Sequence, residues 1–340
     1  MVPALAVATE LRAEGAEVLF IGADRAEVEL VPQAGFQFHQ IAVEGLSRTN
    51  PLRAARALGL SIRALANAYR LLGKLEPDAV MGGGGYVAGP VGLAAIMRRI
   101  PLVLTEADSH LGLTNRALAP FAQRVCLSFE IAGRTSSRYL CTGRPVMRVS
   151  RERDGARESL GVGAEERLLV VFGGSLGARS INYAAIDAFA TGQRDYAVLH
   201  IAGRRDYPEL SARELPVRYR LLDYLDQTEF SAALGAADLV IARSGGSVFE
   251  MAASGVPAVL VPYPHAAADH QTVNARWMAE AGAAVVIADR DLNAERLAAT
   301  VEELFADPGR LGQMASASLG LARPQAAAQV ADELLRAARG

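Results

Sequence analysis

Short apolar runs alternate with longer segments of helical periodicity along most of this chain. Runs typical of buried strands occur at residues 17–22, 78–82, 101–105, 167–172, 196–203, 219–225, 236–242, 257–263 and 283–288. Helical segments lie between most of them. Continuous apolar strands that alternate with helices are typical of parallel sheets covered on both faces. The pattern therefore predicts an α/β fold.

An interruption of this pattern near the middle of the chain predicts two domains. Residues 139–155 are rich in Pro, Gly and charged residues, as expected of an interdomain linker. A chain of 340 residues also exceeds what one hydrophobic core usually covers. We expect domains at residues 1–143 and 144–323, followed by an Ala-rich amphipathic helix at 324–340 that can pack back on the N-terminal domain.

The N-terminal domain begins in an unusual order for this fold class. Residues 3–14 have helical periodicity, with Pro3 in the first turn and Gly15 at the end, and the first strand follows. A doubly wound domain starts instead with a central strand and a glycine loop. We expect that this strand is missing because the start is assigned too late, at Met1. The alternative is a fold that simply begins with a helix.

Composition narrows the possible classes of function. Charged residues make up 21% of the chain and the formal net charge is -2, which excludes a globally basic nucleic-acid binder. Cys126 and Cys141 stand alone and predict two buried thiols in a reducing, cytoplasmic setting. Asp289 and Asp291 form a D-x-D pair, but capping of the following helix explains them better than a metal. We therefore assign no metal site.

Two further patterns concern the cell membrane. The sequence contains neither the basic start of a signal peptide nor an apolar run of roughly 18 residues, so we expect a protein that is neither secreted nor membrane-spanning. Residues 44–74 are basic, with interleaved leucines, and form either a solvated helix face or a surface that rests on an anionic membrane. The charged residues of this segment are Glu44, Arg48, Arg53, Arg56, Arg63, Arg70 and Lys74, with Arg98 and Arg99 nearby in sequence.

Residues 243–274 carry the densest candidate chemistry. Residues 243–247 form a tight loop between a buried strand and a helix that carries Glu250, and Asp269 is placed to cap the next helix. Unpaired N–H groups at such helix starts suit a phosphate. Polar side chains here lie outside the carboxyl ends of the strands, where open α/β sheets bind ligands. The candidates on the second helix are His270, Gln271 and Asn274.

Residues 173–177, with the sequence GGSLG, fit three templates. As G-x-S-x-G after a strand, they are similar to a hydrolase nucleophile elbow centred on Ser175, with His265 or His270 as the later histidine. Glycines at a strand-to-helix turn are also typical of a dinucleotide loop, although the G-x-G-x-x-G spacing is broken. The same turn can simply bind a diphosphate.

Polar loops also follow two predicted strands in the N-terminal half. Four consecutive glycines at residues 82–85 allow a ligand to approach the backbone closely, and Tyr86, Glu106 and Asp108 project from positions at strand ends. Glu106 is a candidate base. A lone carboxylate in a loop is more often a hydrogen-bond partner.

Taken in order and spacing, five stretches resemble the MurG family over essentially the whole chain. They are PALAVATEL, GGGGYVAGP, TEADSHLGLTN, GGSLGARSIN and RSGGSVFEMAASGVPAVLVPYPHAAADHQTVNA. Members of this family are the peptidoglycan N-acetylglucosaminyltransferases that convert lipid I to lipid II. The resemblance implies a GT-B fold, in which two Rossmann-like domains with parallel sheets face a cleft. It places the lipid acceptor on the N-terminal domain and UDP-N-acetylglucosamine on the C-terminal one.

The resemblance also implies the reaction and its setting. The transfer would be inverting and would need no metal or cofactor. The partners would be UDP-N-acetylglucosamine, lipid I and an anionic membrane surface, with no nucleic acid. The protein would be peripheral at the cytoplasmic face of the cell membrane, and it would serve cell-wall biogenesis, cell shape, cell division and the cell cycle.

Site residues follow from the resemblance by position. It implies that residues 173–177 meet the diphosphate, Glu250 the ribose, the Leu225 backbone the uracil, and His270 and Gln271 the sugar hydroxyls. The implied donor-binding residues are Asp108, Arg148, Gly174, Ser175, Gly177, Leu225, Arg243, Gly245, Gly246, Ser247, Glu250, His270 and Gln271. Those on the acceptor side are Gly84, Gly85 and Tyr86, with Glu106 as the catalytic candidate.

The chain departs from the family pattern in several places. The family's H-E-Q-N is T-E-A-D at residues 105–108, its G-N-P-V-R is G-R-P-V-M at 143–147 with an arginine only at Arg148, and the loop before Glu250 is one residue shorter. The G-G-T-G-G-H loop that carries the family's usual base histidine would precede Val2. We therefore expect the chain as written to bind UDP-N-acetylglucosamine but to transfer sugar about 10²- to 10⁴-fold more slowly than with a positioned base.

Two rival functions remain open at this point. One is another GT-B glycosyltransferase that acts on a glycolipid, and the other is a UDP-sugar-binding protein with impaired catalysis.

Overall fold

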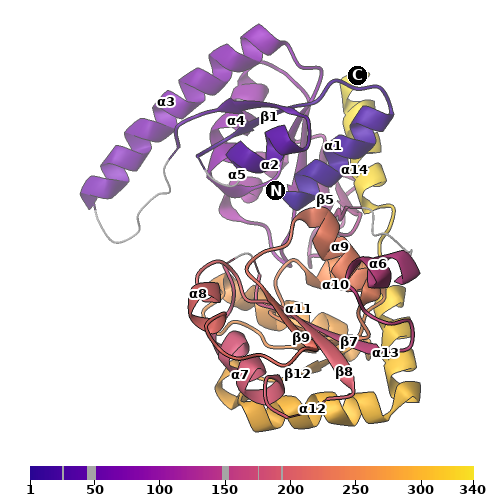
Figure 1. Cartoon of the computed structure of the whole chain (residues 1–340). Helices are drawn as coiled ribbons and strands as arrows, with labels where there is room; N and C mark the ends of the chain where they lie inside the picture. Colours follow the sequence, from indigo (N-terminus) through magenta and orange to yellow (C-terminus); the bar gives the residue numbers. More distant parts are fainter. Residues whose placement is uncertain (25–26, 44–50, 148–152, 175, 193) are drawn as a thin grey trace. The chain divides into compact units, whose positions relative to one another are not determined.

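The computed structural model describes residues 1–340 except 25–26, 44–50, 148–152, 175 and 193, and it leaves the side chains of residues 51–61 undescribed. The chain forms two compact units, one of residues Met1–Met147 with Arg323–Gly340 and the other of Arg148–Ala322 (Figure 1). The sequence predicted boundaries at 143/144 and 323/324, within a few residues of these. Both units are α/β with parallel strands, as the apolar runs predicted.

Unit 1 contains two parallel sheets. Strands β1 (Leu19–Gly22) and β2 (Gln37–Gln40) pair with each other, and the second sheet has the order β3-β4-β5-β6. Among the described residues no strand joins β1 to β3. The strands of the second sheet are β3 (Val80–Gly82), β4 (Leu102–Glu106), β5 (Arg124–Leu127) and β6 (Tyr139–Cys141). The helices are α1 (Val2–Ala13), α2 (Glu27–Gln33), α3 (Pro51–Leu75), α4 (Gly85–Met97), α5 (Leu113–Leu118), η1 (Ala119–Phe121) and α14 (Ala326–Ala338).

Alternate residues of the β3-β6 sheet face two separate apolar layers. Leu102 and Leu104 of β4 pack with residues of α3 and α4, including Leu72. Val103, between them, packs on the other face with Val330 of α14. This period of two is the geometry of a strand buried on both faces. Helix α14 also packs along α1, so both chain ends belong to the same layer of unit 1 (Figure 1).

An ion pair reinforces this layer. The Glu333 side chain on α14 is only 6% exposed, and its two carboxylate oxygens accept from Arg124 Nε on β5 and from Arg336 Nη1, each at 2.6 Å. Cys126, on the same strand as Arg124, is buried against α14, and burial raises the pKa of its thiol to about 12. Cys141 is exposed, so the prediction of two buried thiols is wrong for it. Its strand β6 lies at the edge of the sheet.

Unit 2 is a six-stranded parallel sheet in the order β12-β11-β10-β7-β8-β9. Counted from β7, this is the 3-2-1-4-5-6 order of doubly wound nucleotide-binding domains. The strands are β7 (Arg167–Phe172), β8 (Tyr196–Ile201), β9 (Tyr219–Leu222), β10 (Leu239–Ala242), β11 (Ala258–Leu260) and β12 (Ala284–Val286). The helices are α6 (Arg153–Ser159), α7 (Arg179–Phe189), α8 (Tyr207–Leu210), α9 (Gln227–Ala236), α10 (Val248–Ser254), η2 (Ala267–Asp269), α11 (His270–Glu280), η3 (Asp289–Asp291), α12 (Ala294–Ala306) and α13 (Pro308–Gly320).

The core of unit 2 lies between this sheet and helices α7 and α12. Leu169 and Val171 of β7 and Ile241 of β10 pack there with Ile181 of α7 and Val301 of α12, all at 0% exposure. The polar residues predicted to bind a ligand follow the carboxyl ends of these strands.

We expect Glu333→Gln to lower the free energy of unfolding of unit 1 by about 1.5 kcal/mol, the lower end for hydrogen bonds to charged groups because Arg124 is partly exposed. Urea unfolding followed by circular dichroism measures this. The control is Glu303→Gln, which removes a Glu–Arg310 pair on exposed helix faces and should cost less than about 1 kcal/mol. Equal effects of the two changes would contradict the role assigned to Glu333.

Candidate functional site

A glycine turn follows β7, the central strand of unit 2. Gly174 and Gly177 have φ values of 98° and 77°, in the left-handed region, and Gly177 N donates to Gly174 O at 2.9 Å. A Cβ atom on Gly177 would lie 2.0 Å from Ala202 O, and one on Gly173 would lie 2.2 Å from Ala178 N. Both positions therefore require glycine. Ser175 lies outside the described residues, and the exposed Leu176 side chain marks the outer surface of the turn.

The loop after β10 lies beside this turn. Strand β10 pairs with β7 in parallel, with Ala242 opposite Phe172. The loops that begin at residues 243 and 173 therefore follow the carboxyl ends of two adjacent strands. The chain runs from β7 outward to β8 and β9 on one side and to β10, β11 and β12 on the other. The two loops thus flank the topological switch point, where open α/β sheets bind ligands.

Hydrogen bonds from α11 hold the loop after β10 in shape. Ser244, at 0% exposure, donates from Oγ to Gln271 O at 2.8 Å, and Asn274 Nδ2 donates to Ser244 O at 2.9 Å. Gln271 Oε1 in turn accepts from Tyr263 N at 3.0 Å. Ser244 and Asn274 are buried, whereas Gly245, Gly246 and Ser247 stay partly exposed. The backbone N–H groups of such a loop suit an anion.

Arg243 is buried beside the loop rather than directed into solvent. Its guanidinium pairs with Asp289 Oδ1 at 2.6 Å, donates to Ser180 Oγ at 2.8 Å, and donates to the carbonyls of Val261 and Pro262 at 3.1 Å. Asp289 is not the helix cap that the sequence predicted, because Asn293 caps α12 through Arg296 N. Sequence reasoning missed this ion pair, since its partners are 46 positions apart.

The positions predicted to contact the nucleoside lie near one another. Gln227 Nε2, two residues after Leu225, donates to Glu250 Oε1 on α10 at 2.9 Å. His270 Nδ1 lies 2.7 Å from Ala267 O, at the start of α11. Asp269 adopts φ 54° and accepts from Thr272 Oγ1 instead of making the predicted backbone cap. The donor-binding roles of the described residues stay predictions, and Arg148 lies outside the described part of the chain.

In unit 1 the catalytic candidate Glu106 ends β4, and Asp108, predicted to bind the donor, follows two residues later. Glu106, 6% exposed, accepts from Asp108 N at 3.2 Å, from Gly112 N at 2.8 Å and from Asn115 Nδ2 at 2.9 Å. Asp108 and Gly112 belong to the loop after β4 and Asn115 to α5, so the carboxylate ties that loop to the helix that follows it. A base role for Glu106 stays a prediction.

The glycine turn before α4 lies next to this loop. Gly84 and Gly85 have φ values of 80° and 77°, and a Cβ atom on Gly84 would lie 3.8 Å from Asn115 Nδ2. Tyr86, the next residue, is 56% exposed. As the sequence predicted, the loops that carry Gly84, Gly85, Glu106 and Asp108 lie at the carboxyl ends of the neighbouring strands β3 and β4.

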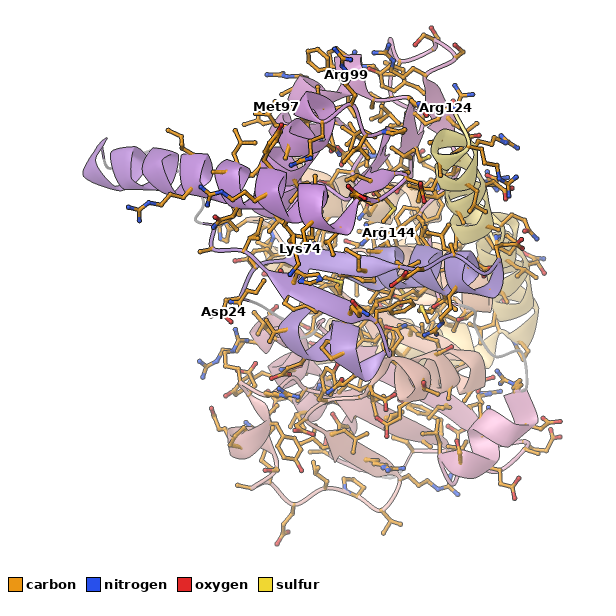
Figure 2. All side chains as sticks on the ribbon, turned by 90° about the horizontal axis from the view of Figure 1, so that it is seen from above. Asp24, Lys74, Met97, Arg99, Arg124 and Arg144 are labelled. Carbon is orange, nitrogen blue, oxygen red and sulfur yellow. The ribbon has the colours of Figure 1, made fainter. Side chains whose placement is uncertain are left out.

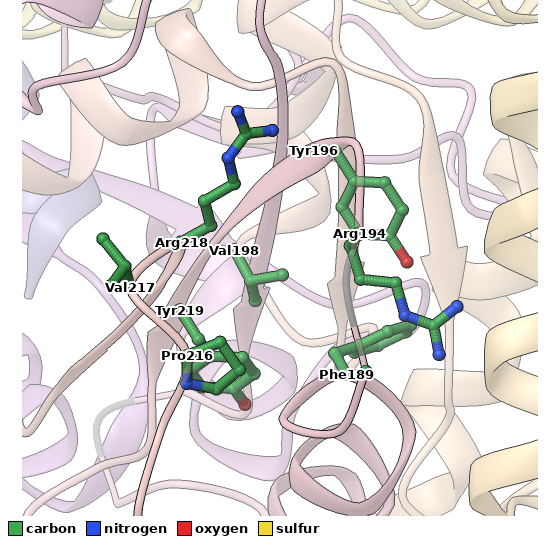
Figure 3. A pocket seen from close by; sticks show the side chains of 9 residues that line it. Phe189, Arg194, Tyr196, Val198, Pro216, Val217, Arg218 and Tyr219 are labelled. Atoms are coloured by element: carbon green, nitrogen blue, oxygen red, sulfur yellow. The ribbon is translucent and has the colours of Figure 1, made fainter.

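Two hollows lie away from these loops. A cavity of about 470 Å³ in unit 2 is lined by residues at the amino ends of β8 and β9, including Tyr196, Val198 and Tyr219 (Figure 3). A second, of about 370 Å³, lies between β2 and α3 of unit 1. Neither is lined by a residue predicted to bind the donor. Within the described ranges we find no cluster of three or more metal-ligating side chains, and no helix there has the length and apolar character to cross a bilayer.

A 3-2-1-4-5-6 parallel sheet with glycine turns at its switch point defines unit 2 as a nucleotide-binding domain of the Rossmann-like class. The glycosyltransferase family 28 N-terminal domain matches residues 1–127, and the glycosyltransferase family 28 C-terminal domain matches residues 168–332. The chain belongs to glycosyltransferase family 28 and, within it, to the MurG family, and its fold is GT-B.

Curated relatives and a solved structure support this assignment. The chain is 41% identical to a Moorella thermoacetica protein and 42% identical to a Rubrobacter xylanophilus protein, covering 98% of this chain in both cases and 95% and 99% of the relatives. Both relatives are named UDP-N-acetylglucosamine–N-acetylmuramyl-(pentapeptide) pyrophosphoryl-undecaprenol N-acetylglucosamine transferase. The crystal structure of Acinetobacter baumannii MurG is 28% identical, with a TM-score of 0.73 over 98% of this chain and 95% of that one.

We expect Asp289→Asn to lower the free energy of unfolding of unit 2 by up to about 3 kcal/mol, because it leaves the buried Arg243 without its counter-charge. Partial exposure of Asp289 reduces the effect. The matched control is Asp291→Asn on the same turn, where the pair with Arg290 is exposed and 3.8 Å long, so the change should be within about 0.5 kcal/mol. Similar urea midpoints for both variants would contradict the importance of the Arg243–Asp289 pair.

Proposed function

We propose that this protein transfers N-acetylglucosamine from UDP-N-acetylglucosamine to undecaprenyl-pyrophosphoryl-N-acetylmuramyl-pentapeptide, which converts lipid I to lipid II in peptidoglycan synthesis. The observation that carries the proposal is the pair of adjacent glycine loops at the switch point of unit 2, in a chain about 40% identical to transferases named for this reaction. The acceptor side is the edge of unit 1 that carries Gly84, Gly85 and Tyr86.

The proposed donor chemistry needs no metal or cofactor. The diphosphate of the donor lies against the N–H groups of residues 173–177 and 245–247, with the ribose hydroxyls at Glu250. Because these N–H dipoles are fixed before the reaction, they stabilise the negative charge that builds on UDP as the glycosidic bond breaks. The acceptor hydroxyl attacks from the opposite face of the sugar, so the transfer inverts the anomeric centre.

Saturable binding of UDP-N-acetylglucosamine, tighter than that of UDP-glucose, is expected in a calorimetric titration of this chain. Glu250→Ala should weaken it about 10- to 100-fold, the loss of a hydrogen bond to a charged group. Glu303→Ala, on the exposed face of α12, is the control and should bind normally. A transfer assay that offers lipid I and diacylglycerol side by side then tests the acceptor. Binding of neither nucleotide sugar, or transfer to diacylglycerol alone, would overturn the proposal.

The proposal includes peripheral binding at the cytoplasmic face of the cell membrane, in support of cell shape and cell division. The surface concerned, here called the α3–α4 surface, combines exposed apolar and basic side chains on two helices that pack together. Arg98 lies 4.1 Å over the Tyr69 ring, which joins the two helices at this surface. Figure 2 shows Lys74 on α3 and Met97 and Arg99 at the end of α4. The surface comprises Ile62, Arg63, Tyr69, Arg70, Lys74, Leu93, Met97, Arg98 and Arg99.

Two details favour a lipid surface over plain solvation. Ile62 and Met97 are 62% and 57% exposed, which gives apolar groups that can enter the headgroup region. Arg70 and Lys74 line the hollow between β2 and α3, where a phosphate headgroup can meet both cations. Of the basic segment predicted from sequence, Glu44 and Arg48 and the side chains of Arg53 and Arg56 lie outside the described residues.

In flotation with vesicles, the protein should bind phosphatidylglycerol-containing membranes and not pure phosphatidylcholine. Arg70→Glu with Lys74→Glu should weaken binding at least tenfold, since each basic residue contributes about 1 kcal/mol near an anionic surface. Ile62→Ser should also weaken it, whereas Val217→Ser, a fully exposed apolar residue of unit 2, should not. Binding that ignores lipid charge and the α3–α4 substitutions would contradict this surface.

A further inference from the structure

A chain of buried hydrogen bonds runs through unit 2 toward the glycine turn. Tyr219 OH on β9 lies 2.7 Å from His200 Nδ1 on β8, and His200 Nε2 lies 3.1 Å from Asn182 Oδ1 on α7. Asn182 Nδ2 donates to Ala202 O at 2.7 Å and to Asp206 Oδ2 at 2.9 Å. His200 and Asn182 are both 0% exposed. This series of hydrogen bonds therefore connects β9, β8 and α7, and its central residues have no contact with solvent.

Chemistry allows only one direction for these hydrogen bonds. A carbonyl and a carboxylate can only accept, so the Asn182 amide must point its nitrogen at Ala202 and Asp206 and its oxygen at His200. His200 must then carry its proton on Nε2, which leaves Nδ1 as an acceptor for the Tyr219 hydroxyl. With this assignment each polar atom of the His200 and Asn182 side chains has its partner. The chain is consequently a rigid, fully satisfied network.

The protonation states of the network's side chains stay the same near neutral pH. Burial lowers the pKa of His200 to about 3, so the ring stays neutral. The other titratable groups of the network are Tyr219 and Asp206. Burial raises the pKa of Tyr219, and the hydrogen bond from Arg205 lowers the pKa of Asp206. Arg205 pairs with Asp206 through Nε and Nη2, at 2.8 and 2.9 Å, which fixes the far end.

The hydrogen-bond network ends at Ala202 O, where the backbone that follows β8 touches the glycine turn. A Cβ atom on Gly177 would lie 2.0 Å from Ala202 O, the atom that Asn182 holds, and one on Gly203 would lie 2.3 Å from Gly177 N. Backbones this close move together, because neither can shift without a clash. The position of Ala202 O therefore determines the position of the Gly177 backbone.

We propose that Tyr219 and His200, acting through Asn182 and the backbone of residues 202–203, are positioning residues that hold the glycine turn in the shape that receives the donor's diphosphate. The inference rests on the proposed function and deepens it. It assigns a role in donor binding to two side chains that lie on the strands beneath the site and need not touch the nucleotide.

The cavity in Figure 3 offers a matched pair of variants. Tyr219 and Tyr196 both line it, and both are almost fully buried. The Tyr219 hydroxyl is hydrogen-bonded to His200, whereas the Tyr196 hydroxyl is buried with no hydrogen-bond partner among the described atoms. Tyr→Phe at either position removes one oxygen at a cavity wall. Only the change at Tyr219 deprives His200 Nδ1 of its donor.

The experiment measures UDP binding by calorimetry at pH 7 for the full chain and its variants. We expect Tyr219→Phe to raise the Kd about fivefold and His200→Leu about tenfold or more, which correspond to one and to more than one net hydrogen bond. His200→Gln should recover much of the affinity, since its amide can still donate to Asn182 Oδ1. Tyr196→Phe should bind as the unchanged protein does.

A stability control separates positioning from general weakening of the core. Val301→Ala is buried in the same core but outside the hydrogen-bond chain, so it should lower the urea midpoint without changing the Kd for UDP. If Tyr219→Phe and His200→Leu bind UDP as tightly as Tyr196→Phe does, the inference is overturned while the proposed function stands. If the unchanged protein binds no UDP, the proposed function fails and the inference fails with it.

Discussion

The close approach of two backbones beside the central strand of unit 2 is the constraint on which the proposed donor site depends. The turn after β7 and the residues after β8 meet at Gly177 and Ala202, with no room for a side chain between them. This contact fixes where the N–H groups of the turn point. A preorganised set of N–H groups binds and stabilises a diphosphate without the cost of reordering a loop. Asn182 holds Ala202 O at this contact through a hydrogen bond of 2.7 Å.

Buried polar groups also fix the loops near this contact. Arg243 ties the ends of β10 and β11 to α7 and η3, and Asn274 ties the loop after β10 to α11. Each of these side chains would cost free energy if left unpaired, so each contact specifies one arrangement of its neighbours. Buried Glu106 has a similar role in unit 1, since it accepts hydrogen bonds from two N–H groups of the loop that follows β4 and from Asn115 on α5. In both units a buried polar residue at a strand end shapes the loop that follows the strand.

Much of the fold could be predicted from the apolar runs, and the exceptions have a common cause. The runs at 167–172, 196–203 and 236–242 became β7, β8 and β10, because short continuous apolar stretches that alternate with helical segments are typical of strands buried in a parallel sheet. Strands β2, β5 and β6 were not predicted. All three are only three or four residues long, and β2 and β6 are also partly exposed, so pairing with a neighbour decides their conformation. His200 was a missed signal, since a polar residue inside an apolar strand needs a buried partner.

By itself, the sequence determined the fold class, the two-domain organisation and the family, because these follow from periodicity and from motifs whose residues are close together in the chain. It also identified the glycine turns, whose composition alone reveals them. Only the tertiary structure decided which polar side chains meet. Arg243 with Asp289, Gln227 with Glu250, and Tyr219 with His200 and Asn182 are each brought together by strands and helices far apart in sequence. Local pattern carries no information about such partners, since the geometry of the whole sheet sets the distances between them.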